Sequence, residues 1–192
     1  MEKKRNKELE VIALYLENYA GRFYLRQISK LANLPLKTCQ NVVGVLEKEK
    51  IVKSKVEGKN KYFSLNLDNI QTKSYLLQAE IYTADKFLKK HPSFKTFLKS
   101  VHTSASLIVF GSYAKSTAGK DSDIDMLVLS DKKQDLPFHL LPYETHLLTM
   151  EEETFKNVLE KKEGIAKEIE ENHVILNNPS YYVNLLWEHY GK

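Results

Sequence analysis

The most informative part of the chain runs Leu107-Ile-Val-Phe-Gly-Ser-Tyr-Ala-Lys-Ser-Thr-Ala-Gly-Lys-Asp-Ser-Asp-Ile-Asp-Met-Leu-Val-Leu-Ser130. It starts with four consecutive apolar residues, a pattern typical of a strand that is buried on both faces. Gly111-Ser112 follows directly, and a short helix can begin there. Asp123-Ile124-Asp125 then opens a second apolar run, which ends at Leu129. The pattern predicts two buried strands joined by a short helical insert, and therefore a fold that mixes helices with strands.

The Gly-Ser pair and the two aspartates each predict one half of a binding site. Backbone N–H groups at a helix N-terminus bind phosphate readily. Gly111 lets the backbone approach a ligand closely, and the Ser112 hydroxyl adds a hydrogen bond. Side chains alternate along a strand, so Asp123 and Asp125 face the same side. Because Mg²⁺ prefers one or two carboxylates plus substrate phosphate oxygens, we expect a phosphate cradle beside a site for two ions about 3.5–4 Å apart.

These two motifs together resemble the signature of a known family. Gly111-Ser112-Tyr113-Ala114-Lys115, followed by Ser122-Asp123-Ile124-Asp125, is similar to the pattern of the minimal nucleotidyltransferases, in the polymerase-beta-like nucleotidyltransferase superfamily. The spacing matches without insertion, and the resemblance covers roughly residues 93–160. It implies an enzyme that moves a nucleoside monophosphate from a nucleoside triphosphate, with ATP as the favoured donor, to an acceptor hydroxyl or amine. It also implies two Mg²⁺ ions.

The resemblance assigns roles residue by residue. It makes Asp123 and Asp125 the metal-binding and catalytic carboxylates. It also implies a third such carboxylate on a later strand, for which we choose Glu144. His146 shares a face with Glu144 on that strand and is the alternative general base. The positions expected to bind the nucleotide are Gly111, Ser112, Lys115 and Ser122.

Two positions qualify this match. Ser116 stands where the family usually has a glycine, so we expect a slightly less flexible loop with activity retained. Lys115 has a second interpretation, as a solvated loop lysine that contacts no phosphate.

Charge divides the chain into two parts. Its 192 residues carry 29 Lys and Arg against 25 Asp and Glu, a net charge of +4. Residues 1–75 hold 15 basic and 8 acidic residues, whereas residues 76–192 hold 14 and 17. A basic part suits a polyanion such as nucleic acid, and an acidic part suits metal cations or a solvated surface. We therefore expect two units with different partners.

Periodicity in the basic part predicts three helices followed by a hairpin. Apolar residues recur at helical spacing over residues 7–20, and again over 24–32 with Ile28 and Leu31 facing inward. A third helix starts with Pro35 in its first turn. Two short β-type runs follow, separated by a turn that contains glycine.

This order of elements resembles a winged helix-turn-helix domain over about residues 7–67. In such domains the third helix enters the major groove and the hairpin lies along the backbone. Solvated faces, or a module that binds another protein, are the alternatives. The side chains expected to contact double-stranded DNA are Lys37, Thr38, Gln40, Asn41, Lys48, Lys59 and Lys61.

We therefore expect an α+β protein in three segments. Residues 1–69 form a winged helix-turn-helix DNA-binding domain and residues 70–92 a connecting helix. Residues 93–192 form a nucleotidyltransferase domain, a mixed sheet flanked by helices, with further helices at the C-terminal end. The connecting helix carries a short apolar stripe, which we expect to pack on the neighbouring domain or to form a homodimer seam: Leu77, Ile81, Ala84 and Leu88.

Composition narrows the class of protein further. Apolar residues make up 42%, enough for a real core. The single cysteine, Cys39, excludes an internal disulfide and a cysteine-based zinc site, and it fits a cytoplasmic location. No apolar run approaches the roughly 20 residues needed to span a bilayer, and no hydrophobic segment follows the charged N-terminus as in a signal peptide.

A second hypothesis is a non-enzymatic regulator. The winged helix would bind an operator, and the nucleotidyltransferase-like domain would sense a nucleotide or hold a partner. Relatives in the family include antitoxin-like proteins paired with a small helical toxin, so a partner of that kind is a further expectation. Turnover of the nucleotide separates the two hypotheses.

Overall fold

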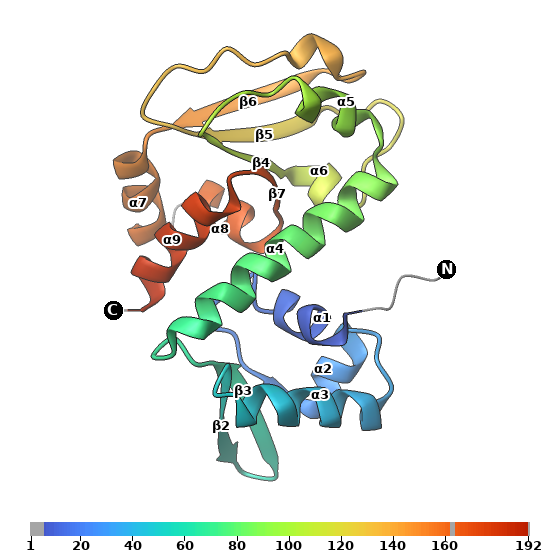
Figure 1. The fold of residues 1–192 in the computed structure, drawn as a ribbon, viewed down its shortest axis with the longest axis vertical. Coiled ribbons are helices and arrows are strands. Elements are labelled where there is room, and N and C mark those ends of the chain that lie inside the picture. The colour runs from blue at the N-terminus through green and yellow to red at the C-terminus, as the bar shows by residue number, and fades with distance from the viewer. Residues whose placement is uncertain (1–5, 162–163, 192) are drawn as a thin grey trace. The chain divides into compact units, whose positions relative to one another are not determined.

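The computed structural model describes residues 6–161 and 164–191. The chain divides into two compact units (Figure 1). The first contains the residues up to Ala79 and those from Tyr190 onward, and the second is Glu80–His189. The boundary falls within α4 (Ile70–Lys90), which begins where the predicted connecting helix begins and ends two residues earlier. Among the described helices, none combines the length and the apolar character that a membrane span requires.

The first unit contains the predicted order of three helices and a hairpin. The Asn6 side chain caps the first helix by accepting a hydrogen bond from the backbone N–H of Leu9 at 3.2 Å. The Gln27 side chain accepts one from the N–H of Tyr24 at the start of the second. The elements are α1 (Lys7–Ala13), β1 (Phe23–Tyr24), α2 (Leu25–Leu31), α3 (Leu36–Lys48), β2 (Val52–Glu57) and β3 (Asn60–Leu65).

The hairpin of this unit is closed by a two-residue turn. Glu57 pairs with Asn60 at the end of the antiparallel β2–β3 ladder. Gly58, the first turn residue, has φ +60, a conformation that costs glycine little. The short strand β1 adds to the other side of β3, which gives a three-stranded sheet in the order β1-β3-β2.

Two predictions for the first unit were wrong in detail. The helix expected over residues 7–20 ends at Ala13, because the next N–H groups bond three residues back rather than four; that of Tyr15, for example, donates to the carbonyl of Ile12. Tyr15 is buried nevertheless, and its hydroxyl donates to the carbonyl of Phe63 at 3.0 Å. Leu31, expected to face inward, is 57% exposed.

The second unit is built on a four-stranded mixed sheet in the order β6-β5-β4-β7. The central pair β4–β5 and the pair β4–β7 are antiparallel, whereas β5 and β6 are parallel. The two predicted apolar runs form the two central strands, which are almost completely buried. The strands are β4 (Ser106–Phe110), β5 (Ile124–Leu129), β6 (Thr145–Met150) and β7 (Val174–Asn177).

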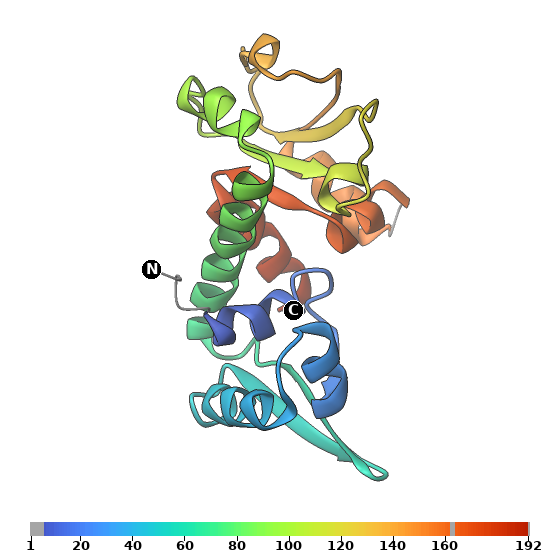
Figure 2. The same ribbon diagram turned by 90° about the vertical axis from the view of Figure 1, so that its right-hand side faces the viewer.

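Helices cover both faces of this sheet (Figure 2). One face packs Leu107 and Val109 of β4 and Met126 of β5 against Phe94 and Phe97 of α5. On the opposite side lie α7, α8 and α9 (Figures 1 and 2). The unit is therefore a mixed sheet flanked by helices, as expected for a nucleotidyltransferase fold. Its other elements are α5 (Ser93–Lys99), α6 (Gly111–Ala114), η1 (Phe138–Leu140), α7 (Glu152–Glu160), α8 (Gly164–Glu171) and α9 (Pro179–Tyr190).

The apolar stripe predicted on α4 is only partly buried: Ala84 and Leu88 pack against the hydrophobic core of the second unit. Ile81, in the middle of the stripe, is 54% exposed, whereas Leu76, Ala79 and Phe87 are buried. Glu80 is buried as well, and its carboxylate accepts a hydrogen bond from the His173 ring at 3.0 Å. A homodimer along the stripe stays a prediction.

Candidate active site

The turn from β4 into α6 brings the backbone of Gly111 against the Asp125 carboxylate. Gly111 has φ +66, and a Cβ built on it would lie 2.2 Å from Asp125 Oδ2. Phe110, the preceding residue, pairs with Asp125 in the antiparallel ladder, which explains the contact. A residue without a side chain is therefore required here for two reasons, the left-handed backbone and the carboxylate beside it.

The two aspartates and His146 form one cluster at the start of β5. Asp123 lies just before the strand and Asp125 is its second residue; their side chains are 42% and 33% exposed. His146 pairs in register with Asp125 across the parallel β5–β6 ladder. Its ring nitrogens lie 3.6 Å from Asp123 Oδ2 and 3.5 Å from Asp125 Oδ1. Both carboxylates thus face the same side, and the imidazole of His146 contacts both of them. All three side chains are accessible to solvent.

Glu144 lies at the same edge but makes a different contact. It precedes β6, and its carbonyl accepts a hydrogen bond from the N–H of Ile124 at 2.8 Å. Its side chain is exposed, and in the described part of the chain its carboxylate forms no hydrogen bond or ion pair. The structure therefore brings His146, rather than the Glu144 carboxylate, into contact with the aspartates.

The chemistry of these donors fits Mg²⁺ bound together with a phosphate. Within residues 6–161 and 164–191, no three His, Cys, Asp or Glu side chains form a group that could enclose a metal ion. Asp123 and Asp125 form no ion pair with a Lys or Arg among the described residues. Such carboxylates suit Mg²⁺ when substrate phosphates and water complete its shell. Asp123 and Asp125 would be the residues that hold it.

Ser112 and Ser122 shape the loop between α6 and β5. The Ser112 carbonyl accepts hydrogen bonds from the N–H groups of Thr117 and Ala118 at 2.9 and 3.1 Å. The Ser122 hydroxyl oxygen accepts one from the N–H of Gly119 at 2.8 Å. Both residues expected to bind nucleotide thus fix the backbone of residues 117–119 beside the aspartates.

Lys115 and Ser116 occupy the exposed end of α6. The Lys115 ammonium lies 2.8 Å from Glu168 Oε1 of α8, so this cation already has a carboxylate partner. Ser116 has φ +58, in the left-handed region that favours glycine. Its backbone conformation explains why the family pattern carries a glycine at this position.

A cavity of about 470 Å³ adjoins the same loop. Its lining includes Tyr113 and Tyr143. Tyr113 is a buried residue of α6, two positions after Gly111, and Tyr143 directly precedes Glu144. Burial, the nearby Tyr143 and the charge of Asp123 raise the pKa of Tyr113 to about 12. Sequence reasoning missed these two tyrosines and His91, although Tyr113 lies inside the quoted motif.

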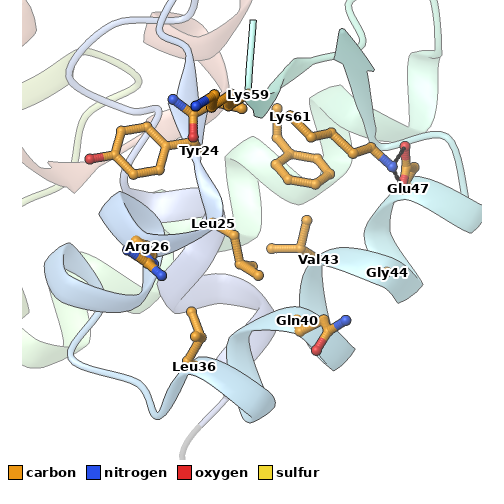
Figure 3. A pocket seen from close by; sticks show the side chains of 12 residues that line it. Tyr24, Leu25, Arg26, Leu36, Gln40, Val43, Gly44, Glu47, Lys59 and Lys61 are labelled. Atoms are coloured by element: carbon orange, nitrogen blue, oxygen red, sulfur yellow. Dashed lines mark hydrogen bonds and ion pairs between the residues drawn. The ribbon is translucent and has the colours of Figure 1, made fainter. Parts of the chain in front are cut away.

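In the first unit, a second cavity of about 940 Å³ lies between α2, α3 and the hairpin (Figure 3). Gln40, Lys59 and Lys61, three of the side chains expected to contact DNA, line it together with Arg26 and Glu47. The remaining predicted positions are exposed or half-buried on α3: Lys37, Thr38, Asn41 and Lys48.

Carboxylates already neutralise part of the basic surface of the hairpin. Lys61 lies 2.8 Å from Glu47 of α3, and Lys55 lies 3.3 Å from Glu57. The Lys61 contact and a hydrogen bond from Ser54 lower the pKa of Glu47. By contrast Lys37, Lys48, Lys59 and Arg26 form no ion pair with any described residue.

Comparison with known proteins bears on the second unit. Residues 91–179 match the family model described as nucleotidyltransferase domain. The match supports placing this unit in the nucleotidyltransferase superfamily, and with it nucleotidyl transfer in general. No curated protein and no solved structure matches the chain.

Proposed function

We propose that the second unit catalyses Mg²⁺-dependent transfer of a nucleoside monophosphate from a nucleoside triphosphate to an acceptor hydroxyl or amine, with ATP as the first donor to test. The observation that carries this proposal is the approach of the Asp125 carboxylate to the backbone of Gly111. The turn whose backbone N–H groups would bind phosphate and the Asp125 carboxylate meet there without an intervening side chain. The family match over residues 91–179 supports the same reaction class.

Each residue of the site has a role in this proposal. The N–H groups at Gly111 and Ser112 bind the triphosphate, and Asp123 and Asp125 hold Mg²⁺. The bound metal would supply charge neutralisation on the phosphate oxygens. Glu144 completes the carboxylate set, with His146 as the alternative proton acceptor.

The reaction is an in-line displacement at the α-phosphorus. The acceptor oxygen or nitrogen forms a bond to phosphorus while the bond to pyrophosphate breaks, and the acceptor proton passes to Glu144, His146 or water. Positioning and electrostatic stabilisation supply most of the rate enhancement in such reactions.

Replacing both aspartates tests this proposal. Asp123→Asn with Asp125→Asn keeps the shape of the site and removes its charge, so transfer of label from α-labelled ATP to acceptors in a lysate should fall at least about 100-fold. Asp135→Asn, an exposed aspartate outside the site, is the matched control. Undiminished transfer by the double variant would refute the assignment.

We also propose that the first unit is a winged helix-turn-helix domain that binds double-stranded DNA. Lys37 and Lys48 of α3 and Lys59 of the hairpin turn support this, because they are exposed and no described carboxylate pairs with them. Lys61 is a weaker candidate, since it must leave Glu47 to meet a phosphate.

Salt-dependent binding to duplex DNA tests the second proposal. Lys37→Ala and Lys59→Ala should each weaken binding for all sequences and lower the salt slope by about 1. Lys55→Ala is the matched control in the hairpin, because Glu57 already pairs with Lys55. If the wild-type chain shows no salt-sensitive binding, the first unit binds a protein instead.

The alternative function is a non-enzymatic regulator that binds nucleotide without turnover. The absence of a third carboxylate beside Asp123 and Asp125 favours keeping it, because the described residues form no group of three side chains that could hold a metal ion. Binding of ATP and Mg²⁺ without release of pyrophosphate would select this function. A small helical toxin-like partner and a cytoplasmic location remain predictions under both functions.

A further inference from the structure

The cavity beside Tyr113 has no part in the phosphate chemistry proposed above. Its volume of about 470 Å³ falls within the range of small-molecule sites. Three aromatic rings meet at it: the Tyr113 ring centroid lies 5.4 Å from that of Tyr143 and 5.4 Å from that of His91. The full lining is His91, Tyr113, Ala118, Gly119, Lys120 and Tyr143.

His91 contributes a neutral imidazole ring to the lining of the cavity. Its Nε2 is buried and has no hydrogen bond to any described residue. Burial, with a smaller contribution from Lys90, lowers the pKa of the ring, so His91 is neutral near pH 7. Because Nε2 has almost no accessible surface, a ligand in the cavity meets the rest of the ring and not this nitrogen.

The charges around the cavity limit which ligand fits. Its lining contains no carboxylate, and Lys120 adds an exposed ammonium that pairs with no described residue. A cationic ligand is therefore disfavoured. A neutral planar ring carrying an anionic group satisfies the aromatic walls and Lys120 together.

The cavity also shares its wall with the proposed phosphate site. The loop backbone at Ala118 and Gly119 lines the cavity, and Ser112 and Ser122 hold that loop in place. Tyr113 follows the Gly111-Ser112 pair directly in α6. A ligand with its phosphates at the turn can thus reach the cavity with its other end.

We propose, resting on the function proposed above, that this aromatic cavity binds the nucleobase of the donor nucleoside triphosphate. Tyr143 stacks on the base, the His91 ring packs beside it, and Lys120 lies beside the ribose-phosphate. Since every base has a π face, Tyr143 contributes affinity for all of them.

Calorimetry on the full chain tests this assignment with two probes and Mg²⁺. One probe is the α,β-methylene analogue of ATP, which cannot react at the α-phosphorus, and the other is inorganic tripolyphosphate, which lacks a base. The variants are Tyr143→Leu, which removes the ring, and the matched Tyr143→Phe, which keeps it. We expect the wild type to bind the analogue at least tenfold more tightly than tripolyphosphate. Tyr143→Leu should lose about tenfold for the analogue alone, whereas Tyr143→Phe should lose little.

The other outcomes are equally informative. Equal affinity of the wild type for both probes, or equal loss of both in Tyr143→Leu, would overturn the base assignment while leaving the phosphate site intact. If neither probe binds the wild type, the proposed function and the base site both fail. Should Tyr143→Leu not fold, light-driven labelling of the wild type by 8-azido-ATP decides the matter: a modified peptide that includes Tyr113, Lys120 or Tyr143 is expected, and labelling elsewhere refutes the site.

Discussion

Replacing Gly111 by alanine should destabilise the second unit and displace its central carboxylate. The added Cβ would lie 2.2 Å from Asp125 Oδ2 and 3.0 Å from Cγ, so the carboxylate must move by more than about 1 Å to restore ordinary contact. A non-glycine residue at φ +66 costs about 1–2 kcal/mol, and the forced displacement adds about 1–2 kcal/mol. We expect Gly111→Ala to lower the free energy of unfolding by about 2–4 kcal/mol.

A double-mutant cycle with Asp125→Ala separates the two terms. Without the carboxylate only the backbone cost remains, so Gly111→Ala should cost about 1–2 kcal/mol in that background, a coupling of about 1–2 kcal/mol. Urea unfolding followed by the fluorescence of Trp187 reports on this unit, because Trp187 is the only tryptophan and belongs to α9. Equal costs in both backgrounds would show that the contact with Asp125 does not explain the glycine.

Three further predictions concern the same unit. Ser116→Gly should raise the unfolding free energy by about 0.5 kcal/mol, because relief of the left-handed backbone exceeds the entropy that glycine adds to the unfolded chain; a lower urea midpoint would contradict it. Glu168→Gln should tighten triphosphate binding up to about fivefold, because it releases Lys115 from an exposed ion pair worth about 0–1 kcal/mol. An unchanged affinity in calorimetry would show that Lys115 contacts no phosphate. Burial alone would lower the pKa of His173, but the charge and hydrogen bond of Glu80 and two backbone carbonyls raise it. The pair therefore stabilises the fold below about pH 6.5 and loses this effect as pH rises through the folded pKa. Unfolding midpoints measured across pH 6–9 should fall, and Glu80→Gln should flatten that fall.

Continuous apolar runs predicted the core of the second unit well. Residues 107–110 and 126–129 form the two central strands, which helices cover on both faces, so burial alone selects their sequence. The ends of helices were harder to predict from the sequence. In the first unit the apolar spacing continues past Ala13 to Tyr19, and both Tyr15 and Tyr19 are buried, but the backbone changes to tighter turns. The spacing of apolar residues predicts which side chains are buried. It does not predict whether the backbone there forms α-helical or tighter hydrogen bonds.

The predicted site shows the same division between local and long-range information. The turn at Gly111 and the alternation of Asp123 and Asp125 are local features, and the sequence contains them. Glu168, the partner of Lys115, lies 53 residues later in the sequence, in α8. No local sequence pattern predicts a contact over that separation. The aromatic cavity likewise joins His91, Tyr113 and Tyr143 from three separate segments.

The choice between Glu144 and His146 shows why alternation cannot complete the site. Glu144 lies two positions before His146, so a shift of the strand by two residues would set Glu144 beside Asp125 without moving any other side chain to the wrong face. A tight hairpin would fix the register through its turn, but β5 and β6 are parallel and joined through residues 130–144. The observed register sets His146 beside Asp125 and leaves Glu144 level with Asp123. If Glu144 accepts the proton of the acceptor, Glu144→Gln should impair transfer more than nucleotide binding.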